Sequence, residues 1–311
     1  MTVLFASSRP LDRAENLRAI YNAYDGDKAF CRLSPWRRNP EITSGKYRLL
    51  VADEFPTESP GQVILIGHGI TGGKVSGLDQ AYPYITTRDT ALLTYAVTTS
   101  ESMRPISARQ CGLPAERVLP LGMPRTDAYF GKKKGDGGTF LAGKRAYLFA
   151  PTYRGREDPP YPHINWELLD AKLADDEVMV VKPHMIGERM LRKSYQHIKE
   201  VSAEEPSAPY LMDSDVVITD YSSIILDGFL LGKPAVLFEK NSGYLRSRGM
   251  YLPYPDGYSG RWCDNEWDLI RLLREANSLD KYEERCKWRT AEACDGHATE
   301  RVCDLIRRSI A

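Results

Sequence analysis

Residues that could bind phosphate interrupt an otherwise apolar part of the sequence. The stretch "VVITDYSSIILDGFLLGKPAVLF", 216–238, places polar side chains between two runs typical of buried strands, namely Thr219, Asp220, Ser222 and Ser223. In an open parallel sheet, ligands bind where a strand ends and the free N–H groups of the next helix point outward. The stretch therefore predicts a phosphate site. The alternative is that Ser222 only caps the helix and Asp220 only closes a turn.

Two further strand ends carry similar chemistry. "VVKPHM" places Lys182 and His184 on either side of a proline, and "LFAPTYRG" ends in Arg154, whose planar guanidinium suits phosphate. Taken alone, His184 could equally be a structural histidine, because imidazoles hydrogen-bond readily in loops. Together, the three strand ends predict one phosphate-binding edge in the second half of the chain.

The first half contains a glycine-rich loop, "ILIGHGITGGKVSG". Glycine lets the backbone approach a ligand closely, and His68 follows a buried strand directly. The loop matches neither the phosphate loop of nucleotide triphosphatases nor the dinucleotide fingerprint. We expect His68 to face His184 across a cleft and to act as an acid or base. The glycines of this acceptor-side loop are Gly67, Gly69, Gly72 and Gly73.

Alternating strand and helix patterns must position these residues. "TVLFAS" reads as a strand and "DRAENLRAIYNAY" as a helix with Asp12 as N-cap. The Gly- and Lys-rich segment 130–145 interrupts the rhythm, which then restarts, so we interpret it as a linker. The fold class is α/β, with two Rossmann-type domains whose parallel sheets face each other across a cleft. The predicted domains are an N-terminal acceptor-side domain, 1–140, and a C-terminal donor-binding domain, 141–311.

Composition excludes several classes of function. Among 311 residues, 42 basic side chains balance 42 acidic ones, so no overall field favours nucleic acid. No apolar run approaches the roughly 20 residues that a membrane-spanning helix needs, and the first residues lack a signal peptide. We expect a cytoplasmic protein, either free or attached peripherally to the inner face of the membrane. The six cysteines lack metal-site spacing and predict buried thiols, and no acidic pair has the spacing of a magnesium site.

The whole set of motifs resembles the CDP-glycerol glycerophosphotransferase family of teichoic acid and capsular polymer synthesis. The matching segments are "GHG" at 67–69, "GMPRTDAYF" at 122–130, "FAPTYRG" at 149–155, "VKPHM" at 181–185, the stretch 215–238, "RGMYLPY" at 248–254 and "DGHATERV" at 295–302. The resemblance implies a GT-B-like pair of Rossmann-type domains that transfers glycerol phosphate, or a related polyol phosphate, from its CDP-activated form to an acceptor hydroxyl and releases CMP. The implied acceptor is a glycan or polyol phosphate, including a lipid-linked one.

The resemblance also implies roles for individual residues. His68 matches the general base, and His184 matches the group that steadies the donor phosphates. The segment 219–223 matches the donor-phosphate loop. Neither a cofactor nor a metal is expected.

Two other classes of function stay open. A GT-B glycosyltransferase using a UDP- or GDP-sugar would have the same architecture. A non-catalytic module that binds a nucleotide or sugar phosphate would bind without turnover, and His68 would then be dispensable.

Overall fold

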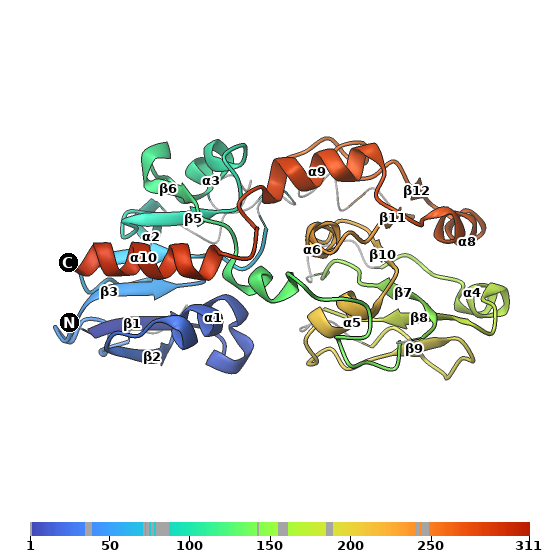
Figure 1. Cartoon of the computed structure of the whole chain (residues 1–311), viewed down its shortest axis with the longest axis horizontal. Helices are drawn as coiled ribbons and strands as arrows, with labels where there is room; N and C mark the ends of the chain where they lie inside the picture. The colour runs from blue at the N-terminus through green and yellow to red at the C-terminus, as the bar shows by residue number, and fades with distance from the viewer. Residues whose placement is uncertain are drawn as a thin grey trace. The chain divides into compact units, whose positions relative to one another are not determined.

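The chain forms two compact α/β units (Figure 1). The structure is a computed structural model and describes residues 2–34, 39–70, 72, 75, 78, 87–141, 143–154, 161–184, 189–240, 243 and 249–311. Unit 1 comprises Met1–Phe130 and Arg289–Ala311, and unit 2 comprises Gly131–Trp288. Each unit is built around its own six-stranded sheet.

Unit 1 contains a parallel sheet with the strand order β2-β1-β3-β4-β5-β6. Its strands are β1 (Thr2–Ser7), β2 (Lys28–Arg32), β3 (Tyr47–Ala52), β4 (Gln62–Leu65), β5 (Tyr95–Thr98) and β6 (Val118–Pro120). Its helices are η1 (Leu11–Arg13), α1 (Glu15–Ala23), α2 (Thr87–Thr90), α3 (Arg104–Cys111), η3 (Ala115–Arg117), η4 (Pro124–Tyr129) and α10 (Ala298–Ile310).

Both faces of this sheet are buried, as the continuous apolar runs predicted. Val3 and Phe5 of β1 contribute to a core shared with α1 and α10, whereas Leu4 and Ala6 contribute to a core on the opposite face. Helix α1 begins at Glu15 after a short 3-10 turn, so the expectation that Asp12 caps it was wrong.

The last helix, α10, belongs to unit 1, which differs from the expected C-terminal domain of 141–311. Its apolar stripe, including Val302 and Ile306, is fully buried in the core beneath β1 and β3. The segment that re-enters unit 1 at Arg289 is also bonded to the loop after β5, because the Ser100 hydroxyl donates to the Arg289 carbonyl at 2.6 Å. Two charge-assisted bonds fix the start of the helix, since Asp127 accepts from the N–H groups of Ala298 and Thr299.

Unit 2 contains a second parallel sheet with the order β12-β11-β10-β7-β8-β9. Its strands are β7 (Arg145–Phe149), β8 (Glu177–Val181), β9 (Ile198–Glu200), β10 (Val216–Thr219), β11 (Ala235–Phe238) and β12 (Trp262–Cys263). Its helices are α4 (Trp166–Lys172), α5 (Ala208–Asp213), α6 (Ile224–Leu230) and α8 (Glu266–Glu275), while α9 (Lys281–Ala291) crosses from unit 2 into unit 1.

The strand that carries the predicted phosphate loop lies in the middle of this sheet. Ile218 of β10 is paired with Phe149 of β7 on one side and with Val236 of β11 on the other. Helix α6 packs closely on β10, because a Cβ atom on Gly228 would lie 2.9 Å from a methyl carbon of Val217. A glycine at this position lets the helix start sit directly beyond the end of the strand.

The predicted linker is ordered where it is described, and it joins unit 2 at residue 131 rather than at 141. Asp213 is fully buried and accepts hydrogen bonds from the backbone of Gly135, Gly137 and Thr139 and from the Thr139 hydroxyl. These bonds lower the pKa of Asp213 although burial alone would raise it. The linker therefore belongs to the amino-terminal edge of the second sheet.

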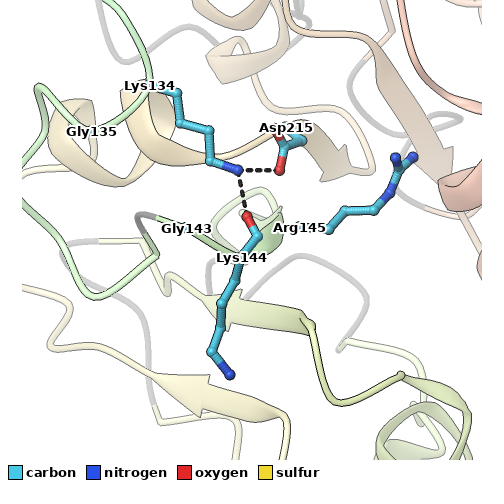
Figure 2. Close-up of a pocket in the computed structure, with 6 residues that line it drawn as sticks. All are labelled: Lys134, Gly135, Gly143, Lys144, Arg145 and Asp215. Carbon is cyan, nitrogen blue, oxygen red and sulfur yellow. Dashed lines mark hydrogen bonds and ion pairs between the residues drawn. The ribbon is translucent and has the colours of Figure 1, made fainter.

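Figure 2 shows a surface pocket of about 490 Å³ at this edge. Lys134 donates at 2.5 Å both to Asp215 and to the Lys144 carbonyl. Arg145 also lines the pocket, and its guanidinium donates to Tyr147, Asn277 and carbonyls of α8. Lys134 thus holds the linker, whereas Arg145 holds α8 and Asn277, so both cations have partners within unit 2. The pocket lies at the opposite strand ends from the predicted phosphate loop.

All six cysteines are buried, as expected. Among the described residues, no helix is both long and apolar enough to span a membrane.

Candidate functional site

His68 follows β4 at the carboxyl edge of the first sheet, where the sequence predicted it. Its side chain is 48% exposed, and its Nε2 atom lies 3.7 Å from Oε1 of Glu54. The pKa of His68 is lowered by desolvation and by the charges of Arg9 and Arg125, and Glu54 opposes this only in part. His68 is therefore neutral at pH 7 and able to accept a proton.

A buried asparagine fixes the loop that carries His68. Asn16 of α1 donates to the carbonyl of Gly67 at 3.0 Å and accepts from the backbone N–H of Arg125 at 2.9 Å. Gly67 has a φ of +78°, which favours glycine over any residue with a Cβ atom. Three segments distant in the sequence thus meet at the residue that precedes His68.

Two carboxylates beside His68 were missed as site residues in the sequence. Asp53 and Glu54 directly follow β3, and each accepts a hydrogen bond from a serine at the end of β1. Ser7, the last residue of β1, donates to Asp53 at 3.2 Å, and Ser8, the next residue, donates to Glu54 at 2.5 Å. Desolvation and the charge of Glu54 raise the pKa of Asp53 to about 6. Two adjacent acids at the end of a buried strand, in "YRLLVADEF", are the signal that could have revealed them.

These two carboxylates and His68 each offer one potential ligand atom, and the three atoms lie within 4.8 Å of one another. Carboxylate and imidazole ligands suit a transition-metal ion. Asp213, Asp215 and Asp220 of unit 2 also accept hydrogen bonds from the protein, but among the described residues they form no comparable group of three potential ligands.

In unit 2, Asp220 organises the end of β10. One carboxylate oxygen accepts from the backbone N–H groups of Thr152 at 2.7 Å and Tyr221 at 2.6 Å. The other forms a buried ion pair with Arg154 at 2.6 Å, and the two side chains are only 7% and 8% exposed. Arg154 and Asp220 are thus brought together as predicted, but as partners of each other.

The hydroxyl groups after Asp220 remain partly accessible. Ser222 and Ser223 are both half-buried, and Ser223 is the N-cap residue of α6. Ser222 accepts a long hydrogen bond from the backbone N–H of Ile224 at 3.5 Å, so the capping alternative accounts in part for Ser222. Among the described residues, Ser223 forms no side-chain capping bond. Thr219, in contrast, is buried and donates to the Ala150 carbonyl at 2.7 Å.

The two residues of the "KPH" segment differ in their surroundings. Lys182 is 6% exposed, and its ammonium group donates to the carbonyls of Pro183 at 2.9 Å and Ala203 at 3.0 Å. Desolvation lowers its pKa. His184 is exposed, and its ring centroid lies 5.4 Å from that of Tyr153.

The structure therefore gathers the predicted residues into two sets. His68, Gly67, Gly69 and Gly72 belong to unit 1, whereas Arg154, Lys182, His184 and the segment 219–223 border the carboxyl edge of the sheet in unit 2. Gly73 lies outside the described residues. The predicted cleft between the two domains remains a prediction.

Comparison with known proteins identifies a family. The sequence model of CDP-Glycerol:Poly(glycerophosphate) glycerophosphotransferase matches residues 50–308. The teichoic acid poly(ribitol-phosphate) polymerase of Bacillus spizizenii is 28% identical over 229 residues, which cover 68% of this chain and 37% of that protein. The teichoic acid glycerol-phosphate primase of Bacillus subtilis is 27% identical over 225 residues, which cover 70% of this chain and 58% of the primase. The chain thus spans only part of the length of these relatives.

Solved structures show the same fold. The wall teichoic acid polymerase TagF superposes with a TM-score of 0.77 at 20% identity, covering 99% of this chain and 88% of that one. A UDP-GlcNAc 2-epimerase from Neisseria meningitidis gives a TM-score of 0.57 at 11% identity, covering 99% and 100%. The two Rossmann-type units form a GT-B-like fold. The match over most of its length shows that this chain belongs to the CDP-glycerol:poly(glycerophosphate) glycerophosphotransferase family.

Proposed function

We propose that the chain transfers glycerol phosphate, or a related polyol phosphate, from its CDP-activated form to an acceptor hydroxyl and releases CMP. The observation that carries this proposal is the end of β10, where the segment 219–223 of the family motif presents two half-buried serines at the start of α6. Free N–H groups at a helix start and nearby hydroxyls are suited to phosphate oxygens.

The residues of unit 2 divide into two roles in this proposal. Ser222, Ser223 and His184 contact the donor phosphates. Arg154, Asp220, Thr219 and Lys182 hold the strand ends that present these groups, since each is buried and bonded within the protein. Positioning and charge stabilisation supply most of the catalysis in phosphoryl transfer.

In the proposed reaction, the acceptor hydroxyl gives its proton to His68. The oxygen attacks the phosphorus that bears the polyol, a new P–O bond forms, and the P–O bond to CMP breaks. Neutral His68 fits this role because its pKa lies below its ordinary value. The acceptor is a glycan or polyol phosphate of cell-wall or capsular polymer synthesis, including a lipid-linked one, and no metal takes part.

The test is release of CMP from CDP-glycerol and CDP-ribitol in the presence of polyol-phosphate and lipid-linked acceptors, with and without a chelator. We expect acceptor-dependent CMP release that the chelator leaves unchanged. Loss of activity with the chelator, restored by a divalent cation, would contradict the metal-free mechanism and direct attention to Asp53, Glu54 and His68. If the chain released a nucleotide only from UDP- or GDP-sugars, and no CMP from the CDP-alcohols, it would be a sugar transferase instead.

A further inference from the structure

A buried amide of α1 is bonded to the loop that carries His68. Asn16 is the second residue of this helix and is only 3% exposed. Asparagine is a weaker helix former than alanine, and burial of its side-chain amide is costly unless the amide is hydrogen-bonded. Helix propensity therefore does not account for an asparagine at this position, and the bonds of its amide have to.

Both ends of this amide bind the backbone of other segments. The nitrogen of Asn16 donates to the Gly67 carbonyl at 3.0 Å, and its oxygen accepts from the Arg125 N–H at 2.9 Å. The Gly67 carbonyl belongs to the planar peptide unit that also contains the Cα atom of His68. In the same way, the Arg125 N–H belongs to the peptide unit that contains the Cα atom of Arg125. Asn16 therefore fixes the peptide planes from which both side chains project.

The two residues held by Asn16 also influence each other. Desolvation and the charge of Arg9 are the main causes of the lowered pKa of His68, and the charge of Arg125 adds to them. The guanidinium of Arg125 is placed by a hydrogen bond from its Nη1 atom to the Tyr129 hydroxyl at 3.0 Å. One buried side chain thus holds the proposed base and a cation that keeps this base neutral.

We propose that Asn16 is a positioning residue of the transfer reaction, which orients the imidazole of His68 through the Gly67–His68 peptide unit. This inference rests on the proposed function, in which His68 is the base. A general base has to lie within about 2.6–3.2 Å of the atom whose proton it removes, and a misplacement of about 1 Å can lower the rate about 10²-fold. A rotation of the bonded peptide plane moves His68 directly. Because Asn16 is buried, it acts through His68 and not by contact with a substrate.

The test is a double-mutant cycle in the full chain. Acceptor-dependent CMP release from CDP-glycerol and CDP-ribitol is compared for the wild type, Asn16→Ala, His68→Ala and the double variant. Asn16→Ala is expected to lower turnover about 10²-fold and to leave CMP affinity nearly unchanged, since the proposed donor groups belong to unit 2. If Asn16 acts through His68, the same substitution should change turnover little once His68 is replaced. Equal losses in the two backgrounds, or no loss in the wild-type background, would overturn the inference.

Asn16→Asp separates the two bonds and keeps the inference testable if the alanine variant fails to fold. The carboxylate can still accept from the Arg125 N–H, but it cannot donate to the Gly67 carbonyl. Turnover is therefore expected to fall in this variant as well, and again only where His68 is present. Full turnover in Asn16→Asp would show that the bond to Gly67 does not position the base.

Thr94→Val is the matched control. The Thr94 hydroxyl accepts from the backbone N–H of Val63 at 3.1 Å, near the amino end of β4, the strand that leads to His68. Its replacement removes a side-chain bond to the same strand but at the other end, so turnover should stay nearly unchanged. A loss as large as that of Asn16→Ala would overturn the inference. If the wild-type chain releases no CMP from either CDP-alcohol, the proposed function itself fails, and the role of Asn16 fails with it.

Discussion

At the residue scale, the proposal depends most on His68. Replacement by alanine is expected to lower turnover by about 10²–10⁴-fold, the usual contribution of a general base, and to leave CMP affinity nearly unchanged. Because its pKa lies below the ordinary 6.5, the neutral form predominates down to that pH. The wild-type rate should therefore change little between pH 8 and 6.5 and fall at lower pH. A decline that begins above pH 7, or an equal loss of CMP binding in the variant, would contradict the role of base.

Asp53 gives a second prediction, on stability. Its pKa is raised from 3.8 to about 6, so the protonated form is favoured by folding. The stabilisation is complete below pH 4 and is lost as pH rises through 6, a difference of about 3 kcal/mol. Asp53→Asn keeps an acceptor for Ser7 and removes the charge.

Urea unfolding of the wild type and the Asp53→Asn variant at pH 4 and pH 7 tests this prediction. The free energy of unfolding of the variant, relative to wild type, should rise between the two pH values. Parallel pH dependence in the two proteins would show that Asp53 does not titrate as described.

Individual residues also show how far sequence patterns reach. The patterns predicted that Asp220, Arg154 and Lys182 lie at strand ends, because strand ends follow from hydrophobic periodicity. They did not predict that Arg154 pairs with Asp220 or that Lys182 binds two carbonyls, because such partners come from different strands and depend on side-chain packing. Glu54 beside His68 was missed for the same reason.

At the scale of elements, the segment 131–144 shows that a glycine-rich composition does not by itself make a flexible linker. Asp213→Ala would remove a buried acceptor of four hydrogen bonds, which leaves three backbone N–H groups without a partner. We expect a loss of about 3 kcal/mol or more in the free energy of unfolding.

Asp136→Ala is the control for this prediction, because Asp136 lies in the same segment, is exposed and accepts only from Lys133 among the described residues. Its effect should stay within about 0.5 kcal/mol. Denaturant unfolding compares the two, and similar small effects would mean that Asp213 does not anchor the segment.

At the scale of the whole molecule, two sheets of parallel strands were predicted, but the return of the C-terminal helix to unit 1 was not. The alternation of strand and helix patterns in the sequence predicts which residues form each element. The domain that a terminal helix joins depends instead on which sheet has an apolar face that no other helix covers. Here Val302 and Ile306 complete the core of unit 1.

A fragment of residues 1–130 is therefore expected to remain unfolded when it is produced alone, because its main core lacks α10. Addition of a peptide of residues 289–311 should restore protection from proteolysis. As control, the same peptide with Val302→Asp and Ile306→Asp should fail. A stable, protected 1–130 fragment would contradict this account.

The most direct test of the central claim is thermal unfolding of the full chain with CDP-glycerol, CDP-ribitol, CMP, UDP-N-acetylglucosamine and GDP-mannose. A ligand at about 100 times its dissociation constant stabilises the fold by about 2.7 kcal/mol, which gives a clear shift in the midpoint. A CDP-alcohol donor site at the start of α6 should give shifts of the midpoint with the cytidine ligands, and these shifts should diminish in Ser223→Ala. Shifts with the UDP- or GDP-sugar alone would contradict a CDP-alcohol donor.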